Sequence, residues 1–162
     1  MTEEYLYDIA SFTNLLDHKI QTELSPDNWN WINEKANGGP ANMRMAFASI
    51  PRKIGKAPIQ FTTEEEAAMQ QLRPELSINA WPIDRLCRVW LLLHVPSADK
   101  DQYVKEIDTL FLSAEMNELV ALYSALPLLA YPEAWRKRCA EGIRSNIGDV
   151  LQAIICNNPY PS

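Results

Sequence analysis

Five polar side chains lie on helix faces that the surrounding pattern predicts to be apolar. They are Asp84, Arg88, Glu118, Arg144 and Asn146. Asp84 and Arg88 are four residues apart, so they are neighbours on one face of a helix. Burying a charge costs on the order of several kcal/mol unless the charge is paired and hydrogen-bonded. We therefore expect these side chains to contact one another inside the molecule.

This set of polar side chains has two interpretations. In the first, the five residues line a pocket between central helices that binds an anionic or hydroxylated small molecule. In the second, they form an internal ion-pair network that fixes the register of the helices, with the arginine stems covering apolar surface. Both interpretations place the side chains of Arg88 and Arg144 in the interior.

A basic cluster interrupts the otherwise acidic chain at Arg52, Lys53 and Lys56, within the run PRKIGK. One interpretation is an anion-binding site that meets a phosphate or an anionic membrane surface. The other is that Arg52 and Lys53 complement the negative end of the preceding helix, while Gly55 turns the chain.

The standard signatures of catalysis and cofactor binding are absent from the sequence. The two histidines, His18 and His94, fall in separate helices without a metal-binding spacing. There is no GxSxG, Walker or GxGxxG motif, and five glycines leave little material for loops that bind phosphate. We predict no metal site, no cofactor and no catalytic residue of a standard class.

The elements that must position these side chains are predicted to be helices, because no segment of useful length alternates apolar and polar residues. The sequence predicts an all-α fold of about eight helices in consecutive antiparallel hairpins, as an α-α superhelix or irregular bundle. The expected helices cover residues 3–21, 25–37, 41–50, 62–73, 83–95, 97 or 99 to 111, 115–126 and 132–157.

The last two helices are predicted to form an antiparallel hairpin around which the rest of the chain is organised. Ser113 is expected to cap the first of them, and Pro127 to stop it. Pro132 is expected to open the second. The helix over residues 83–95 becomes apolar on all sides, which is typical of a helix at the centre of a domain.

Length and composition predict a single domain over residues 1–162, with 47% apolar residues and a net charge of −6. An acidic chain lacks the basic face that a nucleic-acid interface needs. The longest apolar run, residues 89–95, is far shorter than the roughly 20 residues of a membrane span. The acidic start MTEEYLYD differs from a secretory signal, and three cysteines without a CxxC pair fit a reducing compartment. We expect a cytoplasmic protein that does not span the membrane.

Several runs of the sequence resemble the EboA family, in the order in which that family has them. They are PRKIGKA, LRPELSINAWPIDRLCRVWLLL, FLSAEMNELV, NELVALYSALPLLAYPE, RCAEGIRSNIGDVLQAI and NPYP. The resemblance begins at about Met43 and implies a cytoplasmic bacterial protein of metabolite traffic. It also implies cluster-encoded partners, including a polyprenyltransferase-like membrane protein. No catalytic residue carries over. Relatives continue past NPYP with helical sequence, so this chain, ending at Ser162, is expected to be a short form or a truncated one.

The resemblance and the missing catalytic signatures together predict a non-enzymatic binding or adaptor protein. It would help a small, prenyl-linked or secondary-metabolite precursor to reach the membrane. Two alternatives stay open at this stage. One is an enzyme that uses Asp84, Arg88, Glu118 and Arg144 on an anionic intermediate, and the other is a structural scaffold for cluster-encoded enzymes.

Overall fold

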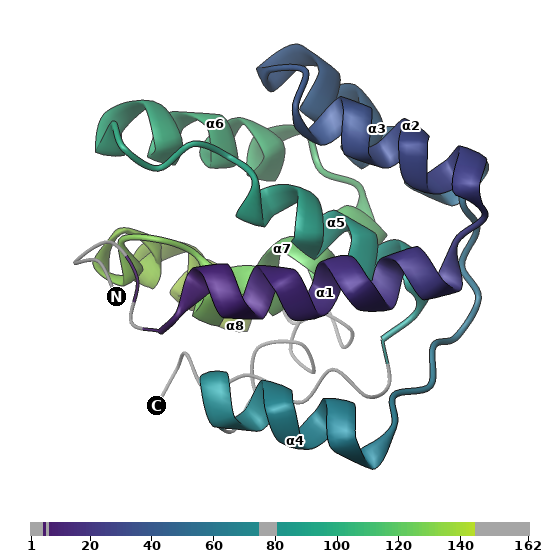
Figure 1. Ribbon diagram of the computed structural model, residues 1–162. Coiled ribbons are helices and arrows are strands. Elements are labelled where there is room, and N and C mark those ends of the chain that lie inside the picture. The colour runs from purple at the N-terminus through teal and green to yellow at the C-terminus, as the bar shows by residue number, and fades with distance from the viewer. Residues whose placement is uncertain (1–4, 6, 75–80, 145–162) are drawn as a thin grey trace.

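The chain folds into packed α-helices (Figure 1). The computed structural model describes residues 5, 7–74 and 81–144, and within these ranges it holds eight α-helices, two short 3₁₀ helices and no β-strand. In chain order the elements are α1 (Ile9–Glu23), α2 (Pro26–Ala36), α3 (Pro40–Lys53), α4 (Thr63–Leu72), α5 (Ile83–Leu93), α6 (Lys100–Ser113), α7 (Met116–Ala125), η1 (Leu126–Leu128), η2 (Pro132–Trp135) and α8 (Arg136–Arg144). The prediction of an all-α fold with about eight helices is confirmed.

Side-chain caps set most of the helix starts. Ser25 accepts a hydrogen bond from the Asn28 amide, and Thr62 and Glu65 form the predicted capping box of α4. Asp99 caps α6. Two predicted starts are wrong. The first helix begins after Asp8 rather than at residue 3, because the Asp8 carboxylate accepts from the Ser11 amide. The α7 cap is Glu115, and Ser113 is instead the last residue of α6.

The centre of the described part of the molecule is α5. It packs against α1, α3 and α7, and Figure 1 shows it in the middle of these helices. Nearly all of its residues are buried, including Trp90, Leu91 and Leu92. The expectation that residues 83–95 form a central helix is confirmed. Of the C-terminal pair that was expected to be the hub, α7 packs along α5, and the greater part of the second predicted helix lies outside the described residues.

Helix α3 continues through Pro51, where the sequence predicted that it would stop. Proline lacks an N–H, so the Phe47 carbonyl four residues earlier loses its normal helical partner. The Nε of Arg88 donates to this carbonyl oxygen at 2.8 Å. A side chain from α5 therefore replaces the missing bond, and the helix runs on to Lys53.

The region after α7 divides into shorter elements than predicted. Pro127 lies inside η1, directly after the end of α7, and Pro132 opens η2, which leads into α8. Tyr131, between the two 3₁₀ helices, has a positive φ of 55°. The Trp135 indole donates to the Ala130 carbonyl at 2.8 Å and closes this corner. The remainder of the predicted helix over 132–157, and its antiparallel packing, lie outside the described residues.

Lys19 ties α1 to α4 and the segment before it. Its Nζ donates to the Gln60 carbonyl at 2.7 Å and to the Glu65 carboxylate at 3.1 Å, and it lies 5.0 Å from the centre of the Phe61 ring. The ammonium group is buried and fully engaged, so its role is to hold these segments together. Within the described ranges, no helix has the length and apolar character that crossing a bilayer requires.

Candidate functional site

The predicted pair Asp84 and Arg88 lies sealed inside the molecule. Asp84 is 4% exposed and Arg88 is 3% exposed. Arg88 Nη1 lies 3.6 Å from Asp84 Oδ2, as expected for residues four apart on one helix. The guanidinium also lies over the Phe47 ring, 5.5 Å from its centre. Because these groups are almost completely buried, they offer a small molecule no open surface.

Arg88 has a structural task in addition to its ion pair. Its Nε donates a hydrogen bond to the Phe47 carbonyl, which Pro51 leaves without a helical partner. One side chain on α5 therefore satisfies a defect in α3 and neutralises a carboxylate on its own helix. This geometry favours the interpretation that the charges fix helix register.

Two further acidic residues lie within electrostatic range of Arg88. Burial lowers the pKa of the Arg88 guanidinium, and the charges of Glu118, Asp84 and Glu115 oppose that shift. Glu118 is half-buried in the first turn of α7, where its carboxylate accepts from the Glu115 amide at 3.1 Å. The structure thus pairs Asp84 with Arg88, and Glu118 acts on the Arg88 guanidinium through its charge.

The other two predicted members of the set do not join it in the described structure. Arg144 is exposed at the end of α8, so the prediction of a buried side chain there is wrong. The helical pattern placed it among apolar neighbours at positions 147, 148 and 151, which lie outside the described residues. Asn146 also lies outside them.

Three buried polar atoms of the core lack a hydrogen-bond partner among the described residues. They are Asp84 Oδ1, Arg88 Nη1 and Ser124 Oγ. The two cysteines within the described ranges, Cys87 and Cys139, behave as small apolar core residues, since both are buried and free. Burial, and to a smaller extent the charge of Asp84, raises the pKa of the Cys87 thiol. Cys87 is therefore not a reactive nucleophile.

The basic cluster lies at the exposed end of α3. Arg52, Lys53 and Lys56 are all exposed, and Arg52 and Lys53 occupy the last turn of the helix. Gly55 has a positive φ of 103° and turns the chain, as expected. Arg44, in the first half of α3, forms an ion pair with Glu106 of α6 at 2.9 Å. The placement fits cations that complement the negative end of a helix.

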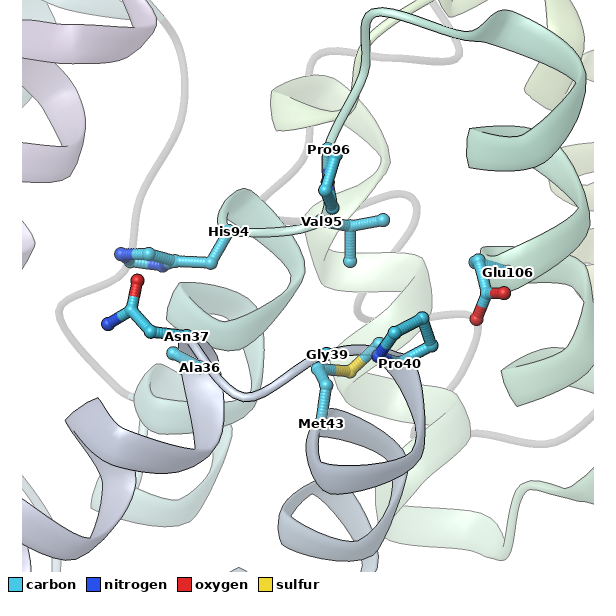
Figure 2. A pocket seen from close by; sticks show the side chains of 9 residues that line it. All are labelled: Ala36, Asn37, Gly39, Pro40, Met43, His94, Val95, Pro96 and Glu106. Carbon is cyan, nitrogen blue, oxygen red and sulfur yellow. The ribbon is translucent and has the colours of Figure 1, made fainter.

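A pocket that the sequence did not predict opens at the C-terminal end of α5 (Figure 2). It has a volume of about 300 Å³ and lies between the turn joining α2 to α3, the end of α5, and α6. Its lining residues are mostly apolar. They are Ala36, Asn37, Gly39, Pro40, Met43, His94, Val95, Pro96 and Glu106.

Polar groups lie at two opposite sides of this pocket. His94 and Asn37 lie on one side, and Glu106 lies on the other (Figure 2). His94 caps the end of α5, and its Nδ1 donates to the Trp90 carbonyl at 2.8 Å. The Glu106 carboxylate accepts from Arg44 at 2.9 Å and from Gln102 at 2.8 Å. The result is an apolar cavity with a few fixed polar groups, which is the usual form of a small-molecule site.

Comparison with known proteins identifies the family. The sequence model described as "Metabolite traffic protein EboA" matches residues 12–162. The chain belongs to the EboA family. No curated protein and no solved structure matches it in the corresponding searches. The match confirms the resemblance seen in the sequence and extends it toward the N-terminus, from about Met43 to residue 12.

In this EboA-family chain, the pocket could not be found from the residue pattern alone. Its walls come from three places in the sequence that have no shared motif, and His94 was noted only as a histidine without metal-binding spacing. The one available signal was the pair of chain turns at Gly38-Gly39-Pro40 and at Pro96. Over the described ranges, no group of three or more metal-ligating side chains gathers in one place.

Proposed function

We propose that this chain is a non-enzymatic binding module of metabolite traffic, and that the pocket at the end of α5 holds the metabolite. The observation that carries the proposal is the cavity of about 300 Å³ with apolar walls and polar groups at two sides. This volume lies at the lower end of the range of about 300–1,000 Å³ that is typical of small-molecule sites. The family description supports traffic as the broad role.

The burial of Asp84 and Arg88 on α5 is evidence against a catalytic site between α5 and α7, and so favours the pocket as the functional site. An enzyme that used Asp84, Arg88 and Glu118 on an anionic intermediate would need a cleft through which the intermediate reaches them. Asp84 and Arg88 are almost completely buried, and Arg88 is held by Asp84 and by the Phe47 carbonyl. The enzyme alternative therefore lacks an accessible site at Asp84 and Arg88.

The ligand and partner that we propose follow from the family resemblance. The ligand would be a prenyl-linked compound or a secondary-metabolite precursor, carried in the cytoplasm to a cluster-encoded protein such as a polyprenyltransferase-like membrane protein. The apolar walls formed by Met43, Val95 and Pro96 suit the hydrocarbon part of such a molecule.

The test is to purify the protein from its own host cells and to identify bound small molecules by mass spectrometry. The decisive variant is Ala36→Phe, which places a larger side chain on the half-buried wall of the pocket. The matched control is Ala48→Phe, the same change at an exposed position of α3. Circular dichroism verifies that each variant folds.

We expect the intact protein and Ala48→Phe to carry the same compound and Ala36→Phe to lose it. A compound that remains bound to folded Ala36→Phe would show that the pocket is not its site. A folded intact protein that carries no compound would count against the binding function itself.

A further inference from the structure

The side chains of His94 and Asn37 each donate an N–H to a backbone carbonyl of the protein. The Trp90 carbonyl can only accept, so the 2.8 Å contact with His94 requires the proton to be on Nδ1. In the neutral ring, Nε2 then carries no proton and is an acceptor. The imidazole lies 4.2 Å from the Trp90 ring, centre to centre, which helps to hold its orientation.

Asn37 is oriented by the same reasoning. Its Nδ2 donates to the Asn33 carbonyl at 2.8 Å, which fixes the amide orientation because the carbonyl can only accept. The remaining Oδ1 is an acceptor. The two prolines of the lining, Pro40 and Pro96, have no N–H to donate.

Glu106 provides acceptors on the opposite side. A carboxylate has about four acceptor positions, and Arg44 and Gln102 occupy two of them. Arg44 neutralises the charge of the carboxylate, so the wall is polar but close to neutral overall. A ligand that brings an O–H can donate to the unused positions, whereas the lone pairs of an oxyanion would face the lone pairs of these acceptors.

We infer, building on the proposed function, that the pocket selects an uncharged alcohol or phenol and discriminates against phosphate and carboxylate head groups. The hydroxyl donates to His94 Nε2 or to Glu106, and the hydrocarbon body contacts Met43 and Val95. The cavity of about 300 Å³ lies at the lower end of the range for small-molecule sites, so it suits a compact ligand. This class replaces the anionic ligand among the sequence-based expectations and retains the hydroxylated one.

The experiment compares probes that share a hydrocarbon body and differ in the head group. Isothermal titration calorimetry would measure geraniol against geranyl phosphate, and 2-naphthol against 2-naphthyl phosphate. We expect each hydroxyl probe to bind at least about tenfold more tightly than its phosphate, because an oxyanion leaves acceptors facing one another. The Ala36→Phe variant should abolish this binding, and Ala48→Phe should leave it unchanged.

Two variants test the polar groups directly. His94→Asn keeps a short side-chain amide that can donate to the Trp90 carbonyl but removes the Nε2 acceptor, so hydroxyl probes should bind about three- to tenfold more weakly. His18→Asn makes the same change at an exposed position of α1 and should have no effect. Glu106→Gln introduces an N–H donor and removes the charge, so it should reduce the preference for the hydroxyl probe.

Each outcome decides the head-group inference, the binding function of the pocket, or both. Tighter binding of the phosphate probes, lost in Ala36→Phe, would overturn the head-group inference and leave the binding function standing. Failure of all four probes to bind the folded protein would also overturn the inference, while the compound co-purified from host cells would still decide the binding function. Binding that survives in Ala36→Phe would contradict both.

Discussion

The two ends of α5 hold polar side chains that differ in what surrounds them. In the first half, Asp84 and Arg88 are buried and face one another, and Arg88 also donates to the Phe47 carbonyl. At the C-terminal end, His94 lies in the wall of a pocket. Its Nδ1 donates to the Trp90 carbonyl of the same helix, and its Nε2 is not part of that bond. The comparison teaches that a polar residue in an apolar helix indicates a ligand site only where some of its hydrogen-bonding capacity remains accessible.

The largest expected effect is on stability, from Arg88→Met. Removing the guanidinium leaves the Asp84 carboxylate buried without its partner and the Phe47 carbonyl without a donor. We expect a loss of about 3–5 kcal/mol in the free energy of unfolding, measured by urea denaturation. The control, Arg52→Met, makes the same change at an exposed position in the last turn of α3 and should stay within about 0.5 kcal/mol of the unaltered protein.

The outcome of this pair of variants decides whether the first half of α5 is a sealed structural core. If Arg88→Met were as stable as Arg52→Met, the buried pair would not fix helix register. A second substitution, Asp84→Asn added to Arg88→Met, should recover part of the loss because it removes the unpaired charge.

The next effect concerns access of solvent to the same region. Cys87 lies one residue before Arg88 and is 0% exposed, and burial raises the pKa of its thiol. We expect a water-soluble maleimide to label Cys87 at least about 100-fold more slowly in the native protein than in urea. Peptide-level mass spectrometry distinguishes Cys87 from the other cysteines. Fast labelling of the native protein would show that this half of α5 is open.

A smaller effect tests the link between Pro51 and Arg88. Replacing Pro51 with alanine restores a backbone N–H that can donate to the Phe47 carbonyl. In the Arg88→Met background this change should therefore stabilise by about 1 kcal/mol more than it does with Arg88 present. Urea denaturation of the four proteins of the double-mutant cycle measures the difference. A coupling energy near zero would mean that Arg88 does not compensate for the proline.

The smallest expected effect on stability is at the pocket. Glu106→Gln removes an ion pair whose arginine side chain is 40% exposed, so we expect a change of no more than about 1 kcal/mol in the free energy of unfolding. The same substitution should change the preference between hydroxyl and phosphate probes. A loss of stability as large as that of Arg88→Met would place Glu106 among the structural charges and remove the contrast between the two regions.

The sequence predicted the first region better than the second, for physical reasons. The spacing of Asp84 and Arg88 along one helix gives their contact directly, and the helix starts at Ser25 and Thr62 follow from local capping chemistry. The partnership of Arg88 with the Phe47 carbonyl depends on how α3 packs against α5, which no local pattern encodes. The burial predicted for Arg144 was wrong because periodicity alone assigned its face.

Local sequence patterns could not predict the pocket either, for a related reason. It exists because the turn after α2, the end of α5 and one face of α6 meet in space, and each part separately reads as an ordinary turn, cap or polar face. His94 shows this most clearly, since its role follows from the bond that its Nδ1 makes to the Trp90 carbonyl. That bond is local to α5, but His94 becomes part of a pocket wall only because the turn between α2 and α3 lies beside the end of α5.

The most direct test of the contrast between the two regions is a titration of the ¹⁵N-labelled protein with 2-naphthol, followed by ¹H–¹⁵N NMR. The aromatic ring of the probe shifts the amide signals of the residues around it. We expect the largest shifts at the amides of Asn37, Met43 and Val95, with those of Asp84 and Arg88 nearly unchanged. Shifts concentrated at Asp84, Arg88 and Glu118, with the pocket signals unmoved, would contradict the assignment of the two regions.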